Sequence, residues 1–336
     1  MQDVAFESDA LQEMVDRDLD SLPLGKRVRL LTGATNWILH PLEEAGLRSI
    51  ALSDGPIGVR GIDDGPGESA QLPNPSAVAA TWDLELVGRL GSLIALEAKR
   101  QGANVVLAPV VNLQRTPFGG RHFECYSEDP LLTGTIAAAY ITSVQAAGVG
   151  ACVKHFLGNE SETDRTTYVA RIDERTLREL YSAPFERAVK EAGVWSVMAA
   201  YNGIDDGVQR SAATEHGNLL KTVLKDEWGF DGVVVSDWLA ANSTAATALA
   251  GLDLVMPGPG GPWEQHLLDA VQSGAVPVAE INDKVRRILT LGARVGALGN
   301  PESTVSSPPV GDVPTRPATE ADPVSRTGGW LVRLPV

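Results

Sequence analysis

Short apolar runs alternate with longer amphipathic segments over most of the chain before residue 300. Each run is rich in Val, Ala, Ile, Leu or Met and carries few charges, as expected of a strand buried on both faces. The six runs are RSIALSD (48–54), NVVLAPV (104–110), GACVKHF (150–156), WSVMAAYN (195–202), DGVVVSD (231–237) and LDLVMPG (252–258). Because strands that alternate with helices pair in parallel, this order predicts a parallel sheet.

The segments between the runs have helical spacing. Three of them are LELVGRLGSLIALEAKRQG (84–102), LLTGTIAAAYITSVQAAG (131–148) and ERTLRELYSAPFERAVKEAG (174–193). At the second segment, Asp129 is expected to be the N-cap, Pro130 the first helical residue and Gly148 the stop. The loop before residue 130 should therefore lead directly into a helix.

Two closures remain for such a sheet, an open doubly wound sheet and a barrel. An open sheet usually has a glycine-rich turn after its first strand, but LSDGPIGVRG lacks GxGxxG spacing, and no Walker GxxxxGK[ST] occurs. The pattern therefore predicts an α/β fold, a TIM-type (β/α)8 barrel over residues 1–298, with an irregular or missing strand. Residues 299–336 are rich in Pro, Ser, Thr and Gly and are predicted to be a linker or disordered tail.

Charge and composition narrow the function classes. The formal net charge of −15 disfavours binding to nucleic acid or to anionic membranes. No run of about 18 apolar residues is present, so no membrane span is expected. The first 30 residues lack the apolar core of a signal peptide, which predicts a cytoplasmic protein. Cys125 and Cys152 are expected to be buried free thiols.

Polar residues follow nearly every apolar run at its C-terminal edge. They are Asp54, Asn112 with Arg115, Lys154 with His155, Tyr201 with Asn202, and Asp237 with Trp238. In a parallel barrel the carboxyl ends of the strands converge on one face, where active sites are built. The pattern therefore predicts that these side chains share one site.

Each of these residues also has an ordinary structural explanation. Asp54 in Asp-Gly-Pro can simply start a turn, and Arg60 can simply pair with a carboxylate on the same face. Tyr201 can be a core ring with a solvated hydroxyl. Lys154 is harder to explain, because a lysine after Gly-Ala-Cys-Val is poorly placed to reach water and needs a partner. Asp237, after a run of valines, is the hardest to explain without a ligand.

The loop RTPFGGRHFECYSEDP (115–130) combines cations, a Gly-Gly pair and aromatic rings, which leaves a phosphate, an acidic partner or a polyhydroxylated ligand open. The chain has no Cys/His cluster of metal-ligand spacing, no HExxH and no GxSxG, so neither a metal nor another cofactor is expected. Carboxylates with Arg, Lys and His suit a saccharide, because each hydroxyl both donates and accepts. Paired acids across a sugar are the usual means of cleaving a glycosidic bond.

Seven motifs, in this order, resemble the N-terminal barrel domain of glycoside hydrolase family 3, the β-glucosidase family. The resemblance covers roughly residues 10–300. The motifs are LSDGPIGVR (52–60), APVVNLQRTPFGGRHFECYSEDP (108–130), VKHFLGNESETDR (153–165), DERTLRELYSAPFERAV (173–189), VMAAYN (197–202), GFDGVVVSDW (229–238) and GLDLVMPG (251–258).

The resemblance implies hydrolysis of terminal non-reducing β-D-glucosyl residues by a retaining mechanism. It implies that Asp237 is the catalytic nucleophile, with Tyr201 beside it and Trp238 on the wall toward the leaving group. The residues expected to bind substrate are Asp54, Arg121, Lys154, His155, Tyr201 and Trp238. The surrounding cations are expected to keep Asp237 ionised, as a nucleophile must be near neutral pH. The implied partner is a β-glucoside or a related small saccharide.

The chain also departs from the family pattern. Two-domain members carry the acid/base glutamate in a second domain, and this chain ends where that domain should start. Single-domain members, the β-N-acetylhexosaminidases, use KHFPGHGxTxxDSH, whereas this chain reads KHFLGNESETDRTTY. No acid/base is therefore identified; Glu160 or Glu162 could substitute, but structural pairing with Arg165 is the favoured explanation.

Several alternatives remain open at this stage. They are a catalytically weak or inactive glycan-binding fragment, a Schiff-base aldolase that uses Lys154, and, least favoured, a phosphate-binding barrel enzyme. The choice among glucose, xylose and arabinose, the aglycone and the existence of a homo-oligomer are also left open.

Overall fold

The computed structural model describes residues 19, 22–62 and 68–299 of the 336-residue chain. These residues all belong to one compact unit, Met1–Ser303. The predicted linker or tail lies outside the described residues except for Gly299, so its assignment stays a prediction.

A five-stranded parallel sheet forms the centre of this unit, with the strand order β1-β2-β3-β5-β8. Each strand falls within one of the first five apolar runs, which confirms them as strands. The bounds are β1 Leu52–Asp54, β2 Val105–Leu107, β3 Gly150–Phe156, β5 Ser196–Ala199 and β8 Val233–Ser236. All residues of β3 are buried, as a strand covered on both faces requires.

The sheet continues beyond β8 and β1 through isolated bridges. The sixth apolar run, 252–258, pairs with β8 on one side and with Thr32 on the other. The segment from Gly33 to Leu39 then leads back to Ala51, the residue before β1. The bridges are Val235–Leu254 and Thr32–Val255, both parallel, and Gly33–Leu39 and Ile38–Ala51, both antiparallel. The predicted barrel is therefore confirmed, and its irregular part is the segment around residues 32–39.

Two of the three predicted helices have nearly the expected bounds, and the third is interrupted. The first two are α4 (Leu84–Arg100) and α5 (Pro130–Ala146). The third divides into α6 (Glu174–Thr176), a π-helical turn (Leu177–Tyr181) and α7 (Ala183–Lys190). Pro184 lies in the first turn of α7, and because proline has no N–H to donate, a new helical segment begins there.

The predicted cap of α5 is confirmed. The Asp129 Oδ1 atom accepts hydrogen bonds from Leu131 N at 2.7 Å and from Leu132 N at 3.0 Å, and Pro130 is the first helical residue. Gly148 ends the helix with φ of 74°. This cap fixes the end of the 115–130 loop.

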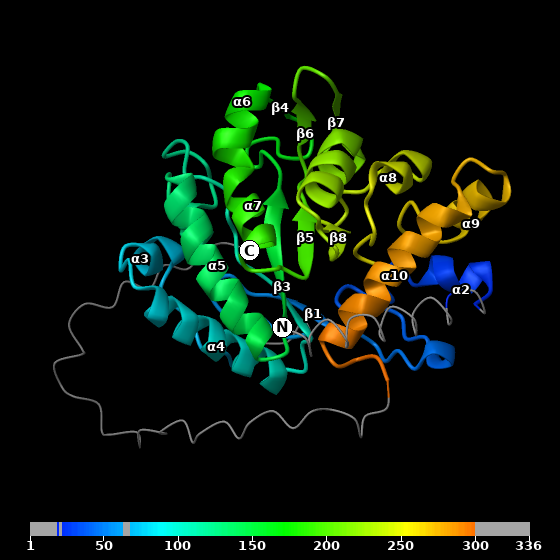
Figure 1. The fold of residues 1–336 in the computed structure, drawn as a ribbon, viewed down its shortest axis with the longest axis horizontal. Coiled ribbons are helices and arrows are strands. Elements are labelled where there is room, and N and C mark those ends of the chain that lie inside the picture. The colour runs from blue at the N-terminus through cyan, green and yellow to red at the C-terminus, as the bar shows by residue number, and fades with distance from the viewer. Residues whose placement is uncertain (1–18, 20–21, 63–67, 300–336) are drawn as a thin grey trace. The chain divides into compact units, whose positions relative to one another are not determined.

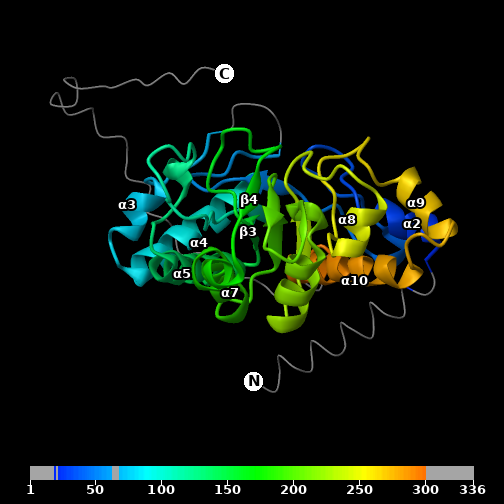
Figure 2. The same cartoon turned by 90° about the horizontal axis from the view of Figure 1, so that it is seen from above.

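Helices α4, α5 and α7 lie side by side along the sheet, and α5 contacts both of the others (Figure 1). The buried residues of α4 recur at helical spacing, from Val87 through Ile94 to Ala98. At Gly91 a Cβ atom would lie only 2.8 Å from the Tyr140 carbonyl oxygen of α5, so glycine permits the close contact. Figure 2 shows α5, α7 and α10 on the same side of the strands.

The remaining described elements complete the unit. A second sheet of three short strands, in the order β4-β6-β7, lies in the connections after β3 and β5. These elements are β4 Val169–Arg171, β6 Gly203–Asp205, β7 Arg210–Ala212, α2 Leu24–Arg29, α3 Pro75–Ala79, α8 Ala245–Ala250, α9 Gln265–Gln272 and α10 Val278–Arg294, with 3₁₀ turns Glu43–Ala45, His122–Glu124 and Ala213–Glu215 and a π-helix Asn218–Glu227.

Two further expectations can be compared with the described part of the chain. Cys125 and Cys152 are both buried and free, which confirms their assignment as thiols. Among the described residues, no helix combines the length and apolar character needed to cross a bilayer.

Candidate active site

A cavity of about 180 Å³ lies at the carboxyl ends of the sheet strands. Its lining includes every residue to which the family resemblance gave a catalytic or substrate-binding role: Asp54, Arg121, Lys154, His155, Tyr201, Asp237 and Trp238. Because the strands are parallel, their C-terminal ends meet at this one edge. Trp37, Leu107, Arg165 and Met198 also line the cavity, and the sequence had not assigned them to it.

Strand β3 contributes two consecutive residues to the lining, Lys154 and His155. Successive side chains of a regular strand point to opposite faces, so only one of the two should reach the cavity. The pairing with β5 shifts here, because Lys154 is paired with Met198 and Phe156 with Ala199, which leaves His155 as an extra residue. A bulge of this kind redirects a side chain, and it explains how both polar groups reach one site.

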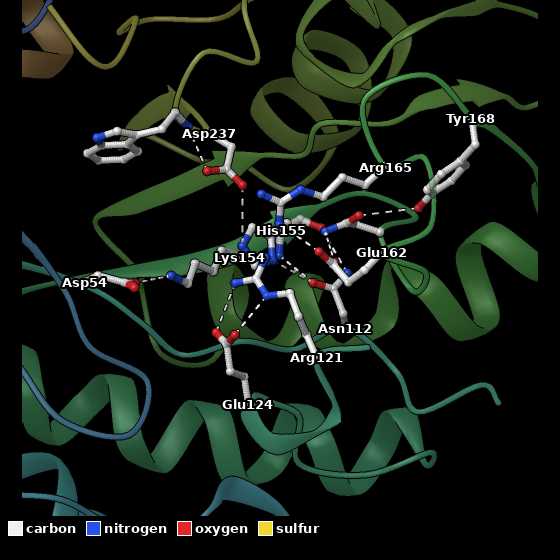
Figure 3. Close-up of polar contacts among 12 residues, drawn as sticks. Asp54, Asn112, Arg121, Glu124, Lys154, His155, Glu162, Arg165, Tyr168 and Asp237 are labelled. Carbon is white, nitrogen blue, oxygen red and sulfur yellow. Dashed lines mark hydrogen bonds and ion pairs between the residues drawn. The ribbon is translucent and has the colours of Figure 1, made fainter. Parts of the chain in front are cut away.

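Asp54 and Lys154 form an ion pair at the base of the site. Lys154 Nζ lies 2.6 Å from Asp54 Oδ1, and only 3% of Lys154 is exposed, so this carboxylate is the partner that the buried lysine needs (Figure 3). Arg60 Nε lies 3.6 Å from Asp54 Oδ2. Burial raises the pKa of Asp54, but Lys154 and Arg60 outweigh it, and the pKa is lowered overall.

Arg121 reaches the cavity from the 115–130 loop. Its Nε donates to Glu124 Oε1 at 2.8 Å and a terminal nitrogen donates to Glu124 Oε2 at 3.0 Å, a bidentate pair that fixes the plane of the guanidinium (Figure 3). Although burial opposes the charge, the pairing with Glu124 raises the pKa of Arg121 further. The arginine is therefore a permanent cation held in one orientation.

His155 is buried between Asn112 and Asp237. Its peptide N–H donates to Asn112 Oδ1 at 2.7 Å, and its Nδ1 lies 3.1 Å from the same oxygen. Its Nε2 lies 3.6 Å from Asp237 Oδ2. Burial, together with the nearby cations Arg121 and Lys154, holds the pKa of His155 well below its usual value, so the imidazole is neutral at pH 7.

Asp237 follows β8, and its two oxygens have different surroundings. Oδ1 accepts a hydrogen bond from Trp238 N at 2.7 Å, whereas Oδ2 is buried and accepts no hydrogen bond of good geometry among the described residues. The Tyr201 hydroxyl lies beside the carboxyl and lowers its pKa through a hydrogen bond. Burial raises the pKa of Asp237 above its ordinary value, and Lys154, the Trp238 N–H and Arg121 oppose this only in part. The cations expected to keep Asp237 ionised do lower its pKa, but the desolvation of the carboxylate is the larger effect and sets the direction of the shift.

Aromatic rings form one wall of the cavity. The Trp37 and Trp238 rings lie 5.0 Å apart at 37°, and Trp238 Nε1 donates to Asn36 O at 2.9 Å. On another side, the Arg165 guanidinium lies 4.4 Å from the centre of the Tyr201 ring. Neither Trp37 nor Arg165 follows an apolar run, so the signal that found the other residues missed them.

Three of the polar residues at the ends of the apolar runs do not line the cavity. Asn112 lies behind His155, and Asn202 is buried and donates to Leu157 O at 3.1 Å. The Arg115 guanidinium lies 5.7 Å from the centre of the Tyr181 ring.

The two candidate acids in the loop after β3 are also outside the cavity lining. Glu162 Oε2 accepts from Arg165 at 2.7 Å, which is the structural pairing considered above. Glu160 Oε1 accepts from Asn112 Nδ2 at 3.2 Å and from Leu113 N at 3.4 Å, and burial raises the pKa of Glu160 to about 7. Among the described residues, Asp54 and Asp237 supply the only carboxyl groups of the lining.

The pKa shifts of Asp54 and Asp237 predict that replacing each carboxylate has an opposite effect on stability at pH 7. Asp54→Asn is expected to lower the free energy of unfolding by about 3 kcal/mol, because it leaves Lys154 buried without its anion. Asp237→Asn is expected to leave the free energy of unfolding unchanged or to raise it, because the substitution removes a desolvated charge. Urea unfolding of both variants at pH 7 measures this.

The pH dependence supplies the control. The lowered pKa of Asp54 means that its contribution is present above the unfolded pKa of about 3.9 and is lost as pH falls through the folded pKa. The raised pKa of Asp237 gives a pH dependence of stability with the opposite sign. Protonation of this carboxyl stabilises the folded protein, because the folded state binds the proton more tightly than the unfolded state does. A destabilised Asp237→Asn variant at pH 7 would contradict this account.

Comparison with known proteins gives a consistent result. A model of the glycosyl hydrolase family 3 N terminal domain matches residues 58–291. A beta-glucosidase of Rhizobium radiobacter is 48% identical over 286 residues, which cover 84% of this chain and 34% of the relative. A thermostable beta-glucosidase B of Acetivibrio thermocellus is 40% identical over 284 residues, which cover 82% of this chain and 37% of that protein.

Solved structures show the same fold. Beta-glucosidase 3B from Thermotoga neapolitana, in complex with glucose, superposes with a TM-score of 0.78 at 35% identity, over 84% of this chain and 42% of that one. A beta-glucosidase from Kluyveromyces marxianus, also in complex with glucose, gives a TM-score of 0.80 at 34% identity, over 84% and 34% of the two chains. The chain thus spans about a third of the length of the curated relatives that it matches.

Proposed function

Because the chain belongs to glycosyl hydrolase family 3, we propose that its cavity binds the terminal non-reducing β-D-glucosyl residue of a glycoside and that Asp237 is the nucleophile of a retaining hydrolysis. The observation that carries the proposal is the Asp237 carboxyl, which lines the cavity after the end of β8 and lies beside His155 and the Tyr201 hydroxyl. The relatives named above are beta-glucosidases, and both solved relatives are complexes with glucose.

The lining supplies the contacts that a sugar requires. The Asp54 carboxylate accepts hydrogen bonds from hydroxyls, and Lys154 and Arg121 donate to hydroxyl oxygens. Trp238 and Trp37 offer an apolar wall to the sugar ring or the aglycone. This combination of ions and rings supports a polyhydroxylated ligand over the phosphate and the acidic partner that the 115–130 loop had left open.

The chemistry follows from the position of Asp237. One oxygen of its carboxylate attacks the anomeric carbon, the bond from that carbon to the aglycone oxygen breaks, and the electron pair leaves with the oxygen, which takes a proton from the solvent. Water then attacks the anomeric carbon of the glycosyl ester from the opposite side and gives one proton to the solvent. The bond between this carbon and the Asp237 oxygen breaks and regenerates the carboxylate, so the configuration is retained. Because the ester is neutral, part of the cost of desolvating the Asp237 charge is recovered in the transition state.

Covalent trapping tests this proposal. With 2,4-dinitrophenyl 2-deoxy-2-fluoro-β-D-glucoside, the fluorine slows both steps while the good leaving group speeds the first, so a glycosyl-enzyme should accumulate. Mass spectrometry of the proteolysed chain is expected to find the label on Asp237. A label on another residue would show that the nucleophile is assigned incorrectly, and the absence of any label would reject the mechanism.

A second candidate function is glycan binding without turnover. It is favoured by one observation: the described part of the lining contains no carboxyl besides Asp54 and Asp237 that could protonate the leaving group. Calorimetric titration with glucose separates the two functions, since heat of binding without any covalent label would favour the binding fragment.

A further inference from the structure

A set of hydrogen bonds lies behind the wall of the cavity, joins Glu160 through Asn112 to His155, and brings the His155 ring beside Asp237. Glu160 Oε1 accepts from Asn112 Nδ2 at 3.2 Å, and Asn112 Oδ1 accepts from the peptide N–H of His155 at 2.7 Å. The ring of His155 then separates Asn112 from the carboxyl, with Nε2 3.6 Å from Asp237 Oδ2 (Figure 3). Glu160 and Asn112 are outside the lining, so they can act on a bound sugar only through His155.

The orientation of the Asn112 amide is determined by its partners. Its Nδ2 has two oxygen acceptors, His155 O at 3.1 Å and Glu160 Oε1 at 3.2 Å. A flipped amide would place its own oxygen against this carbonyl and this carboxyl, and its NH₂ group against the His155 N–H. The atom that faces His155 is therefore Oδ1, which can only accept.

This orientation determines which nitrogen of His155 carries the proton. Nδ1 lies 3.1 Å from Asn112 Oδ1, so it satisfies that contact only as Nδ1–H. The ring is buried among Arg121, Lys154 and Arg165, which excludes a second proton. Nε2 is therefore a bare acceptor, and it donates no proton to Asp237 Oδ2, which lies 3.6 Å away.

We propose that Glu160 and Asn112 are positioning residues that hold His155 as the Nδ1–H tautomer, so that its Nε2 accepts a hydrogen bond from a hydroxyl of the bound sugar and gives the Asp237 carboxylate no hydrogen bond that would weaken its attack. The second half of this inference, the effect on attack by Asp237, rests on the proposed function. In the opposite tautomer, Nε2–H would donate to Asp237 Oδ2, stabilise its charge and weaken it as a nucleophile. The site would also lose an acceptor and keep only the cationic donors and Asp54.

The tautomer can be observed without any activity. In the ¹⁵N-histidine-labelled full chain, long-range ¹H–¹⁵N correlation distinguishes a protonated from a bare ring nitrogen. The His155 signals are identified by their loss in His155→Gln. The expected pattern is a protonated Nδ1 and a bare Nε2 near pH 7; a protonated Nε2, whether in the other neutral tautomer or in an imidazolium ion, would overturn the inference.

Variants test the positioning role. Asn112→Leu removes the acceptor of Nδ1–H, so the proton should move to Nε2, and the rate of trapping at Asp237 should fall by about 10- to 100-fold, the size of one charge-assisted hydrogen bond. Glu160→Leu is expected to act in the same direction with a smaller loss. Glu160→Gln should restore both the tautomer and the rate, because its amide oxygen still accepts from Asn112.

Glu227→Leu is the matched control, since it removes a carboxylate that pairs with Arg178 outside the cavity lining and should leave both readouts unchanged. Histidine signals other than those of His155 should stay in place in every variant and thereby report an intact fold. A changed tautomer with an unchanged trapping rate would overturn the positioning role. A wild-type chain that takes no label would overturn the proposed function, while the NMR measurement still decides the tautomer.

Discussion

Asp237→Ala is expected to lower kcat/KM for 2,4-dinitrophenyl β-D-glucoside by roughly 10⁴- to 10⁶-fold, the size of the loss when a nucleophile is removed from an enzyme. The reason is that no other carboxyl of the described lining except Asp54 could replace it, and Asp54 is already paired with Lys154 at 2.6 Å. Stopped assays of released dinitrophenol over hours measure the residual rate.

Added azide tests whether the loss of rate in Asp237→Ala is due to the loss of a nucleophile. The alanine variant leaves space where the carboxylate was, so added azide should attack the anomeric carbon, restore part of the rate and yield α-glucosyl azide. A β-glucosyl azide would instead assign Asp237 the role of an acid/base. Asp231→Asn is the control, because Asp231 precedes the same strand at its opposite end, is exposed and pairs with Arg294.

The second large effect concerns the leaving group. The polypeptide of these 336 residues is expected to hydrolyse cellobiose about 10²- to 10⁴-fold more slowly than a full-length relative does, the usual contribution of a general acid. The physical reason is that a sugar alkoxide is a poor leaving group unless it is protonated, and among the described residues no carboxyl in the lining is left for that task.

A series of aryl β-glucosides measures the effect. The logarithm of kcat/KM should rise steeply as the pKa of the leaving phenol falls, whereas a full-length relative, such as the enzyme of Rhizobium radiobacter, should show a shallower dependence. Dinitrophenol needs almost no protonation, so the two proteins should differ least with it. A cellobiose rate equal to that of the relative would refute the expectation.

The apolar runs and the caps are local signals, and this explains why they were read correctly. Strand β3 lies exactly over its run because seven buried residues exclude water from both faces. The cap at Asp129 depends only on the next three residues. Parallel pairing then places the ends of the runs at one edge, so the positions of Asp54, Lys154 and Asp237 could be predicted together.

Features that depend on contacts distant in sequence could not be predicted. The bridges of Thr32 and Ile38 have no periodic pattern of their own, and Trp37 enters the cavity only because this segment closes the ring. The bulge at His155 is likewise a property of the register between β3 and β5.

The order of residues was enough to infer the barrel class, most of the strands and helices, and the group of polar residues that meets at one edge of the sheet. The direction of the pKa shift of Asp237, the pairing of Lys154 and the contacts of His155 became known from the folded arrangement. The physical reason is that element formation depends on neighbouring residues along the chain, whereas desolvation and hydrogen-bond partners depend on every atom that folding brings around a group.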